Sequence, residues 1–253
     1  MQGENRVTKS VLRMIGQEKL TELDLYVSEL LDREFSSLKD LVELEFIVND
    51  FIASLNEEEL LVLRSYTGYN FKCINAIIRN NWNYEEHGLL NDEIKLKYLE
   101  LVRKLKEVVN KFPALDVDFC TYRGVELDVF KKFEITKIED LIHLKGKYMY
   151  EEGFTSTSIS SESSYFNKTL ENGKTYNVGI KYLIPRESKD GILLSSSDLS
   201  YSPNQNEYLL NSGSLVKVLD VSVDLERNLA ELVVMLVPKR LWDLENNREV
   251  PGR

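Results

Sequence analysis

The hydrophobic pattern of the chain changes its period at Pro113, and this change limits the fold more than any other feature. From about Thr8 to Lys111 apolar residues recur at spacings near three and four, which is typical of amphipathic helices. After Pro113 the chain instead shows short β-prone runs separated by turn residues. A helical part followed by a strand-rich part predicts an α+β fold, in which helices are segregated from a mainly antiparallel sheet.

Several helix boundaries follow from local signals. Asn56 precedes a run of glutamates, and an N-cap followed by acids in the first turn favours a helix start there. That helix should stop near Gly68, and a short helix is expected over residues 71–79. A longer amphipathic helix over residues 94–109 should end before Pro113.

The part after Pro113 has several runs typical of β-strands. They are rich in β-branched and aromatic residues or alternate in polarity, and turn residues separate them. The expected strands cover residues 117–124, 153–158, 176–184, 191–194, 208–210, 215–223 and 229–237.

The composition is that of an ordinary globular protein, with 43% hydrophobic and 29% charged residues in a chain of 253. No apolar run approaches the ~18 to 20 residues that a membrane span needs. The N-terminal segment lacks the apolar core of a secretory signal, so we expect a cytoplasmic protein unless another route exports it. The net charge of -10 disfavours tight, sequence-independent binding to nucleic-acid phosphates but allows a brief encounter at a local basic face.

Cysteine and histidine are too sparse to indicate a metal site or a catalytic triad. Cys73 and Cys120 lie in apolar surroundings without metal-like spacing and are expected to be reduced core thiols. His87 and His143 complete no triad or zinc motif, so neither is given a catalytic role. We therefore expect chemistry that needs no metal.

The segment before residues 208–210 places an acid and an amide at the start of a strand. Residues 195–204 are rich in turn formers, whereas residues 208–210 are β-prone. In an extended segment residues i and i+2 point to the same side, so Gln205 and Glu207 should face one cleft together. Glu207 is the first candidate for catalysis.

Three pieces of the strand-rich part, in chain order, resemble a known family. They are Arg123 near the end of a strand, the run Ser156-Thr157-Ser158, and Gln205-Asn206-Glu207. In this order they resemble the R-S-E mono-ADP-ribosyltransferases, the class that includes bacterial binary and Rho-modifying toxins. In the helical part, Tyr66-Thr67-Gly68 followed by Asn75 and Arg79 is similar to a stretch that abuts the dinucleotide in this family. Each piece alone is weak, but the ordered combination over residues 55–238 is specific.

The resemblance implies an NAD cleft in an α+β fold whose N-terminal helices pack on two mainly antiparallel sheets. It also implies that residues 51–253 form the catalytic domain and residues 1–50 an N-terminal helical extension, within a single compact unit. Cleavage of the nicotinamide–ribose bond develops positive charge on the sugar, so a carboxylate beside the ribose stabilises the transition state. By resemblance Glu207 has this role and accepts a hydrogen bond from the ribose 2′-hydroxyl.

The resemblance also assigns roles to the neighbouring residues. Arg123 pairs with the pyrophosphate, because a guanidinium fork binds such oxygens in a bidentate way, and the Gly124 backbone is free to approach the nicotinamide amide. Ser156 orients Glu207 through its hydroxyl, and Thr157 and Ser158 shape the floor. The alternatives are a surface acid at Glu207, a salt-bridged arginine at Arg123 and an ordinary β-strand at residues 156–158.

Further contacts to the dinucleotide are implied on both sides of the cleft. Asn75 and Arg79, at i and i+4 on one helix, can reach the same ligand, and Tyr66 joins them near the adenosine. All three also suit capping and packing, which is the alternative reading. The polar loop over residues 160–174 resembles the family's phosphate–nicotinamide loop, and either Tyr165 or Phe166 in it is expected to cover the nicotinamide ring.

Gln205 distinguishes subclasses by its position two residues before Glu207. Arginine-modifying members carry Glu there, whereas Gln resembles enzymes that modify asparagine on Rho-type GTPases and also the pierisin-like enzymes that modify guanine. The preferred expectation is a toxin or effector that modifies a protein side chain, with Tyr201 as a recognition aromatic. The alternatives are a nucleic-acid acceptor in a toxin–antitoxin or antiphage setting, and an inactive NAD-binding module. An antitoxin or a delivery partner is compatible with each of them.

Overall fold

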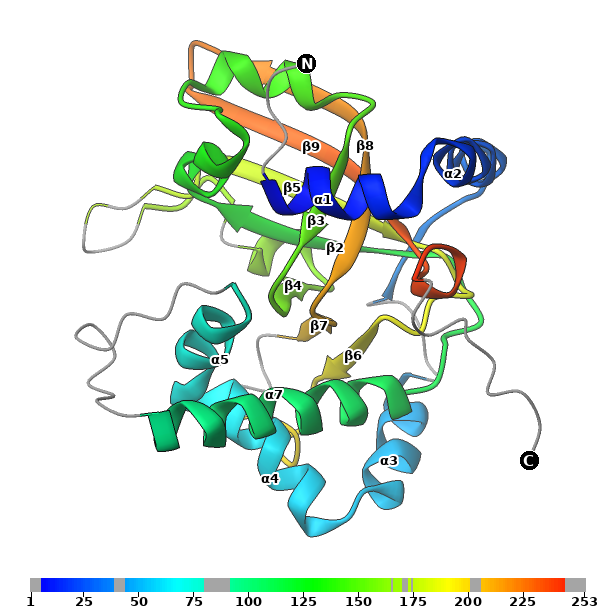
Figure 1. The fold of residues 1–253 in the computed structure, drawn as a ribbon, viewed down its shortest axis with the longest axis vertical. Helices are drawn as coiled ribbons and strands as arrows, with labels where there is room; N and C mark the ends of the chain where they lie inside the picture. The colour runs from blue at the N-terminus through cyan, green and yellow to red at the C-terminus, as the bar shows by residue number, and fades with distance from the viewer. Residues whose placement is uncertain are drawn as a thin grey trace.

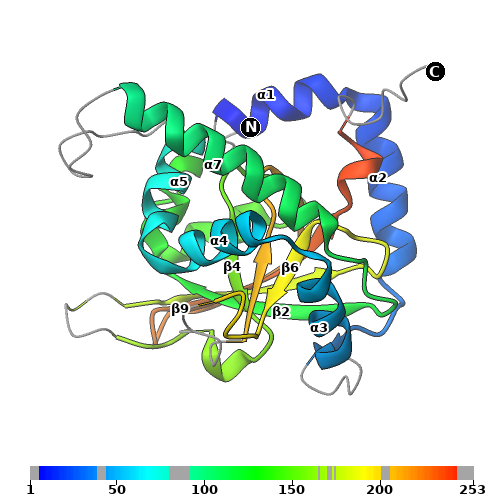
Figure 2. The ribbon, with the colours of Figure 1, turned by 90° about the horizontal axis from the view of Figure 1, so that it is seen from below.

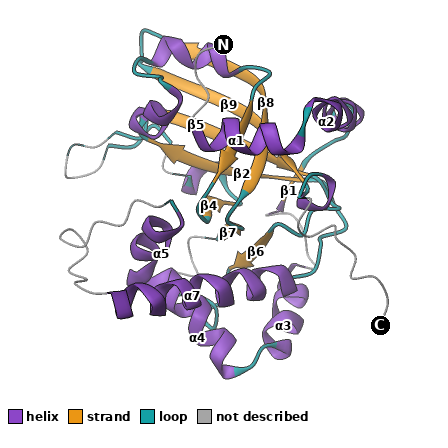
Figure 3. Cartoon of the chain, in the orientation of Figure 1, coloured by secondary structure: helices purple, strands orange, loops and turns teal. Residues whose placement is uncertain are grey.

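The structure is a computed structural model that describes residues 6–38, 44–79, 92–164, 166–169, 173, 175–200 and 206–243. Its α-helices are α1 (Arg6–Ile15), α2 (Gln17–Leu30), α3 (Leu44–Ser54), α4 (Glu57–Ser65), α5 (Phe71–Ile78) and α7 (Asp92–Lys111). Its strands are β1 (Ser36–Ser37), β2 (Phe119–Val125), β3 (Tyr148–Glu151), β4 (Thr155–Ser158), β5 (Val178–Ile184), β6 (Gly191–Leu194), β7 (Glu207–Leu210), β8 (Ser214–Asp224) and β9 (Leu229–Val237). Along the described chain every α-helix precedes β2, as the change of period at Pro113 predicts, whereas in space α1 lies close to the strands (Figure 3).

The strands form one nine-stranded sheet in the order β3-β8-β9-β5-β2-β4-β7-β6, with β1 beside β2. The expectation of two sheets is therefore wrong. Strand β2 pairs with β5 from Phe119 to Val125, and on its other side it pairs with β4 through Tyr122 and Ser158. Because this one residue pair joins the two halves, the sheet is continuous. It is mainly antiparallel, with parallel pairs at β1–β2 and β5–β9.

Two groups of helices cover different parts of the sheet. Helices α3, α4, α5 and α7 lie together beside β4, β6 and β7, and α7 contacts β6 as well as α4 and α5 (Figures 1 and 2). Helices α1 and α2 instead pack on the other half, where Leu23, Val27 and Leu30 meet a buried cluster that includes Leu215 and Met235. Among the described helices, none has the length and apolarity to cross a bilayer.

The start of α4 and the turn after it set the position of α5. The Asn56 side chain accepts a hydrogen bond from the backbone N–H of Glu59 at 3.0 Å, and the Glu59 carboxylate accepts one from Asn56 N–H at 3.1 Å. This capping box confirms the predicted N-cap. A π-helical turn over Tyr66–Asn70 follows, with non-helical torsion angles at Gly68, so the chain changes direction there before α5 begins. The predicted break at Gly68 is confirmed.

Candidate active site

Three adjacent strands carry the residues that the sequence singles out. Arg123 lies on β2, Ser156 on β4 and Glu207 is the first residue of β7. Strands β4 and β7 pair antiparallel with Ser158 opposite Glu207, so Ser156 is a diagonal neighbour of Glu207 on the same face. The register thus brings together residues that are far apart in the sequence.

The Glu207 carboxyl is partly buried, and burial raises its pKa above the ordinary value. The Ser156 hydroxyl and the Arg123 guanidinium act in the opposite direction, since both favour the charged form. Its Oε1 atom is buried and has no hydrogen-bond partner among the described residues. A buried carboxylate oxygen without a donor is costly for the folded protein, and a ligand hydroxyl would satisfy it.

Tyr66 lies in the same group of polar side chains. Burial and the charge of Glu207 raise the pKa of Tyr66 to about 12, while Asn75, Ser156 and Arg123 lower it. Its ring is buried and meets Phe154 edge-on, with ring centroids 5.5 Å apart. The hydroxyl accepts a hydrogen bond from Asn75 Nδ2 at 3.4 Å. Tyr66 therefore couples the helical part to the acid on β7.

Asn75 and Arg79 face the segment that leads into β4. The Asn75 side-chain oxygen accepts the Phe154 N–H at 2.8 Å. A Cβ atom at Gly153 would lie 2.6 Å from that oxygen and 3.0 Å from Nη2 of Arg79, so only glycine allows this close approach. The Asn75 and Arg79 side chains both reach Gly153, as their i, i+4 spacing predicts. Asn75 also has a structural role, since it binds the Phe154 N–H.

Thr157 and Ser158 differ from Ser156 in their surroundings. Ser156 is exposed, whereas Thr157 and Ser158 are buried. Thr157 Oγ1 donates to the Tyr208 carbonyl at 2.7 Å, and Ser158 Oγ accepts the Ser160 N–H at 3.2 Å. These two hydroxyls bond within the sheet, so of the three only Ser156 presents its side chain to solvent.

The backbone of Gly124 is not free in this structure. Its N–H donates to the Ser164 carbonyl at 2.5 Å, so a ligand amide can meet this group only after Ser164 moves. The Phe166 ring packs beside Gly179, where a Cβ atom would lie 3.0 Å from the ring, and Gly179 is the partner of Gly124 across β5 and β2. Of the two loop aromatics, Phe166 thus lies against the sheet near Arg123, and Tyr165 lies outside the described residues.

Gln205 and Tyr201 also lie outside the described residues. An extended chain through Asn206 would place Gln205 on the same side as Glu207. Asn206 instead has a φ of 47°, in the left-handed region, and β7 begins only at Glu207. Strand alternation therefore does not predict the side on which Gln205 lies.

Glu151 was missed by the sequence reasoning. Burial would raise the pKa of Glu151, but Lys132, Arg123 and Arg79 together hold it below the ordinary value. Its carboxylate lies 3.8 Å from Lys132 Nζ. An acid two residues before Gly153 was visible in the sequence, but nothing there showed that cations from three elements would surround it.

The site thus combines two guanidinium groups, Arg123 and Arg79, with two carboxylates, Glu207 and Glu151. Among the residues that the structure describes, no group of three or more His, Cys, Asp or Glu side chains is placed to hold a metal ion. Arg123, Ser156 and Glu207 thus lie on three neighbouring strands of one mixed sheet.

Residues 44–238 match the model of a protein family described as ADP-ribosyltransferase exoenzyme. This match covers well over half of the chain, so the protein belongs to the ADP-ribosyltransferase exoenzyme family, which is a family of NAD-dependent enzymes. A search of curated protein sequences finds no match to the chain.

Solved structures agree with this family in fold. C3stau2 from S. aureus, solved with NAD, has a TM-score of 0.63 at 21% identity, covering 82% of this chain and 100% of its own. The Clostridium limosum C3 exoenzyme has a TM-score of 0.60 at 18% identity, covering 81% of this chain and 98% of its own. BECa from a C. perfringens binary enterotoxin, solved with NADH, has a TM-score of 0.59 at 17% identity, over 76% of this chain and 46% of its own. At these identities the likeness concerns the fold.

Proposed function

We propose that the protein cleaves NAD and transfers ADP-ribose to a macromolecular acceptor, with Glu207 beside the reacting ribose. The observation that carries the proposal is the buried Oε1 of Glu207, which lacks a donor although Ser156 and Arg123 lie close to the same carboxylate. A ribose hydroxyl supplies the missing donor. As positive charge develops on the sugar, the carboxylate gains an attraction that it lacks in the ground state.

Arginines on both sides of the cleft suit the dinucleotide phosphates. Arg123 and Arg79 both act on Glu151, so their guanidinium groups share one neighbourhood. Planar guanidinium forks pair well with phosphate oxygens. Because Glu151 competes for the same cations, binding of the pyrophosphate involves an exchange of anionic partners. We assign Arg123 and Arg79 to the phosphates and Glu151 to holding them in place before NAD arrives.

The remaining groups position the acid and the ligand. Ser156 restrains the orientation of Glu207, and Tyr66 closes the helical side of the cleft with Asn75 behind it. The Gly124 N–H donates to the Ser164 carbonyl, and the carbonyl oxygen of the nicotinamide amide takes the place of this acceptor. The Phe166 side chain, which packs beside Gly179 of β5, flanks the nicotinamide ring. We propose no metal ion in this chemistry.

For the acceptor we propose a protein side chain of the asparagine type, following the Gln-x-Glu subtype. The support is Gln205 in the sequence, since a neutral amide attracts an arginine less than a second carboxylate does. The net charge of -10 favours a protein over a nucleic acid, because phosphates are repelled. On this proposal residues 51–253 are the catalytic domain, residues 1–50 its helical extension, and the protein acts as a toxin or effector.

A labelled-NAD assay with the variant Glu207→Gln tests the proposal. The variant keeps the shape of the side chain but loses its charge, so transfer and NAD hydrolysis should fall by about 100-fold or more. The matched control is Glu231→Gln, an exposed glutamate on β9, which should keep full activity. Wild-type-like rates for Glu207→Gln would contradict the assignment.

The same assay separates the possible acceptors. Labelled NAD is incubated with a cell lysate, and the label is followed after protease and after nuclease treatment. Label removed by protease supports a protein acceptor, and label removed only by nuclease overturns that choice in favour of a nucleic-acid base. Calorimetric binding of NAD without nicotinamide release in any lysate would identify an inactive binding module.

A further inference from the structure

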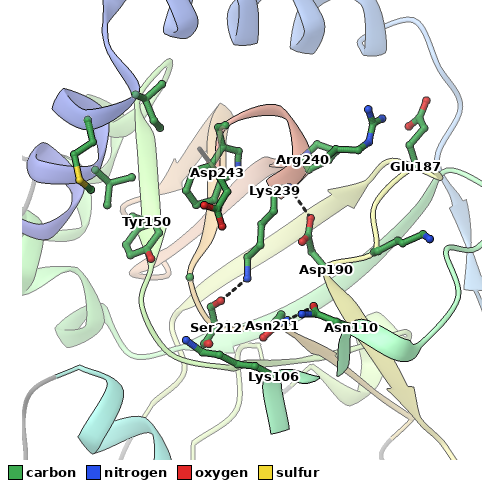
Figure 4. A pocket seen from close by; sticks show the side chains of 17 residues that line it. Lys106, Asn110, Tyr150, Glu187, Asp190, Asn211, Ser212, Lys239, Arg240 and Asp243 are labelled. Carbon is green, nitrogen blue, oxygen red and sulfur yellow. Dashed lines mark hydrogen bonds between the residues drawn. The ribbon is translucent and has the colours of Figure 1, made fainter. Parts of the chain in front are cut away.

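A cavity of about 770 Å³ lies at the end of β7 that is remote from Glu207. It is bounded by α1, by the exposed end of α7, by Asn211 and Ser212 after β7, and by the turn after β9 (Figure 4). Glu207 begins β7 and Asn211 directly follows its end, so about four residue steps of strand, on the order of 13 Å, separate the two sites. None of Arg123, Ser156 or Glu207 lines the cavity.

Three lysines at this cavity form no direct ion pair with a described residue, although Asp190 and Asp243 act electrostatically on Lys239. Lys106, Lys189 and Lys239 line it, and none of them makes an ion pair with a described residue. Lys106 and Lys189 are exposed, whereas Lys239 is largely buried. Burial lowers the pKa of Lys239, Asp190 and Asp243 raise it, and Lys106 lowers it.

Lys239 points into the cavity with donors to spare. Its Nζ donates one hydrogen bond, to the Ser212 carbonyl at 2.6 Å (Figure 4). An ammonium group has three N–H donors, so this one bond leaves the group under-satisfied within the part of the chain that the structure describes. Partial burial makes such a cation costly unless an anion approaches it.

Two of the acids at the cavity have partners in the protein, although Oε2 of Glu187 has none among the described residues. Glu187 pairs with Arg33 at 3.1 Å. Asp190 accepts the backbone N–H of Lys239 at 3.0 Å and the Ser188 hydroxyl at 3.1 Å, and burial raises its pKa. Asp190 and Asp243 raise the pKa of Lys239, but its ammonium group donates to neither carboxylate in the part of the chain that the structure describes.

Two buried polar side chains on the floor are incompletely bonded. Ser212 is 2% exposed and Asn211 is 1% exposed. Ser212 Oγ and Asn211 Oδ1 have no hydrogen-bond partner among the described residues, although Asn211 Nδ2 donates to Asn110 Oδ1 at 2.7 Å. Buried polar atoms are rarely left in this condition, and both belong to residues that line the cavity. The Ser212 hydroxyl can donate to an anion, whereas Asn211 Oδ1 can only accept a hydrogen bond.

The opposite wall is apolar. Val11 and Ile15 on α1 are buried there, and Trp242 stands edge-on to Tyr150 with ring centroids 6.0 Å apart. A concave site of this volume, mainly apolar on one side and with a few convergent polar groups on the other, is the usual form of a small-molecule site.

We propose that this cavity binds a small organic anion, with its carboxylate or phosphate on Lys239 and Lys106 and its apolar body against Val11, Ile15 and Trp242. The anion completes the bonding of the Lys239 ammonium and reaches the floor at Ser212. This site is separate from the NAD cleft, and the proposal does not depend on the proposed function.

Calorimetric titration of the full chain tests the proposal, with phenyl phosphate, benzoate, inorganic phosphate and benzyl alcohol as probes. Either aromatic anion should bind at least tenfold more tightly than inorganic phosphate and than the neutral alcohol, and should change the fluorescence of Trp242. The tighter of phenyl phosphate and benzoate identifies the anionic group. Absence of binding by both anions at millimolar concentration would overturn the proposal.

Two variants locate the binding. Lys239→Met retains most of the apolar stem but removes the charge, and Lys106→Ala changes an exposed side chain, so the second variant keeps the test valid if the first fails to fold. Each variant should lower the affinity for the aromatic anion at least fivefold. Lys137→Met, at an exposed lysine outside the cavity, should leave the affinity unchanged. Unchanged affinity in Lys106→Ala and Lys239→Met would overturn the site. Glu207→Gln should bind the anion as the wild type does, which separates this result from failure of the transferase proposal.

Discussion

The side-chain oxygen of Asn75 accepts a hydrogen bond from the backbone N–H of Phe154 at 2.8 Å, and this bond attaches α5 to the approach of β4. The same residue donates to the Tyr66 hydroxyl, which lies near Glu207. One amide side chain thus sets the distance between the helical half and the sheet at the place where the cleft is formed.

Asn75→Ala should destabilise the protein by about 1–3 kcal/mol, because it leaves the Phe154 N–H without an acceptor. It should also weaken NAD binding, since α5 is no longer held against β4. Asn75→Asp is the matched control, because it keeps an acceptor oxygen for Phe154. Chemical denaturation and NAD titration measure both effects, and equal stability of Asn75→Ala and Asn75→Asp would argue against the bond.

Gly153→Ala should cost about 1–3 kcal/mol, since the added Cβ would lie 2.6 Å from the Asn75 oxygen and force a shift. Removing that oxygen makes room for the methyl group. The double variant Gly153→Ala with Asn75→Ala should therefore lose less stability than the sum of the single variants. Additive losses in denaturant unfolding would show that the two residues do not meet.

Glu207→Gln should be at least as stable as the wild type at neutral pH. The folded pKa of Glu207 is raised by burial, so the folded state binds a proton more readily than the unfolded state. The stabilising contribution of this group is complete below its unfolded pKa of about 4.3 and is lost as the pH rises through the folded value. The variant's advantage in unfolding free energy should grow over this range, and a constant difference from pH 4 to pH 8 would be the contrary result.

Glu151→Gln should show the opposite pH dependence. Lys132, Arg123 and Arg79 hold the pKa of Glu151 below its ordinary value despite burial, so the charged form stabilises the fold above the unfolded pKa of about 4.3. That contribution is lost as the pH falls through the folded value. The variant should be about 1–3 kcal/mol less stable than the wild type at pH 7 and approach it under acid conditions. Glu139→Gln, at an exposed position on a 3-10 turn, is the control, and a similar loss there would contradict the prediction.

The order of helices and strands was predictable because each half of the chain has its own period. The caps and breaks at Asn56 and Gly68 were predictable as well, because they depend on local backbone geometry. The number of sheets was not, because it depends on one long-range pair, Tyr122 with Ser158, that leaves no local signal. Periodicity determines that a strand forms and not which edge it pairs on.

The candidate site shows the same division. Ordered motifs singled out Arg123, Ser156 and Glu207 as candidates, and the register places Ser156 and Glu207 on one face. The left-handed backbone of Asn206 could not be inferred from alternation, and the bond from Gly124 N–H to Ser164 depends on how a polar loop folds back on β2. Glu151 was missed because its surroundings come from three separate elements.

The two-residue strand β1 has a practical consequence for anyone who wants to shorten the chain. Ser36 and Ser37 pair with Phe119 and Cys120 along the edge of β2 that, further on, reaches β4. A truncation that starts at residue 51 removes this pairing together with the two helices over Leu215 and Met235. Such a fragment exposes an unpaired edge of β2 and the apolar surface around Leu215 and Met235. It should therefore aggregate during expression, even though every residue of the candidate active site is still present.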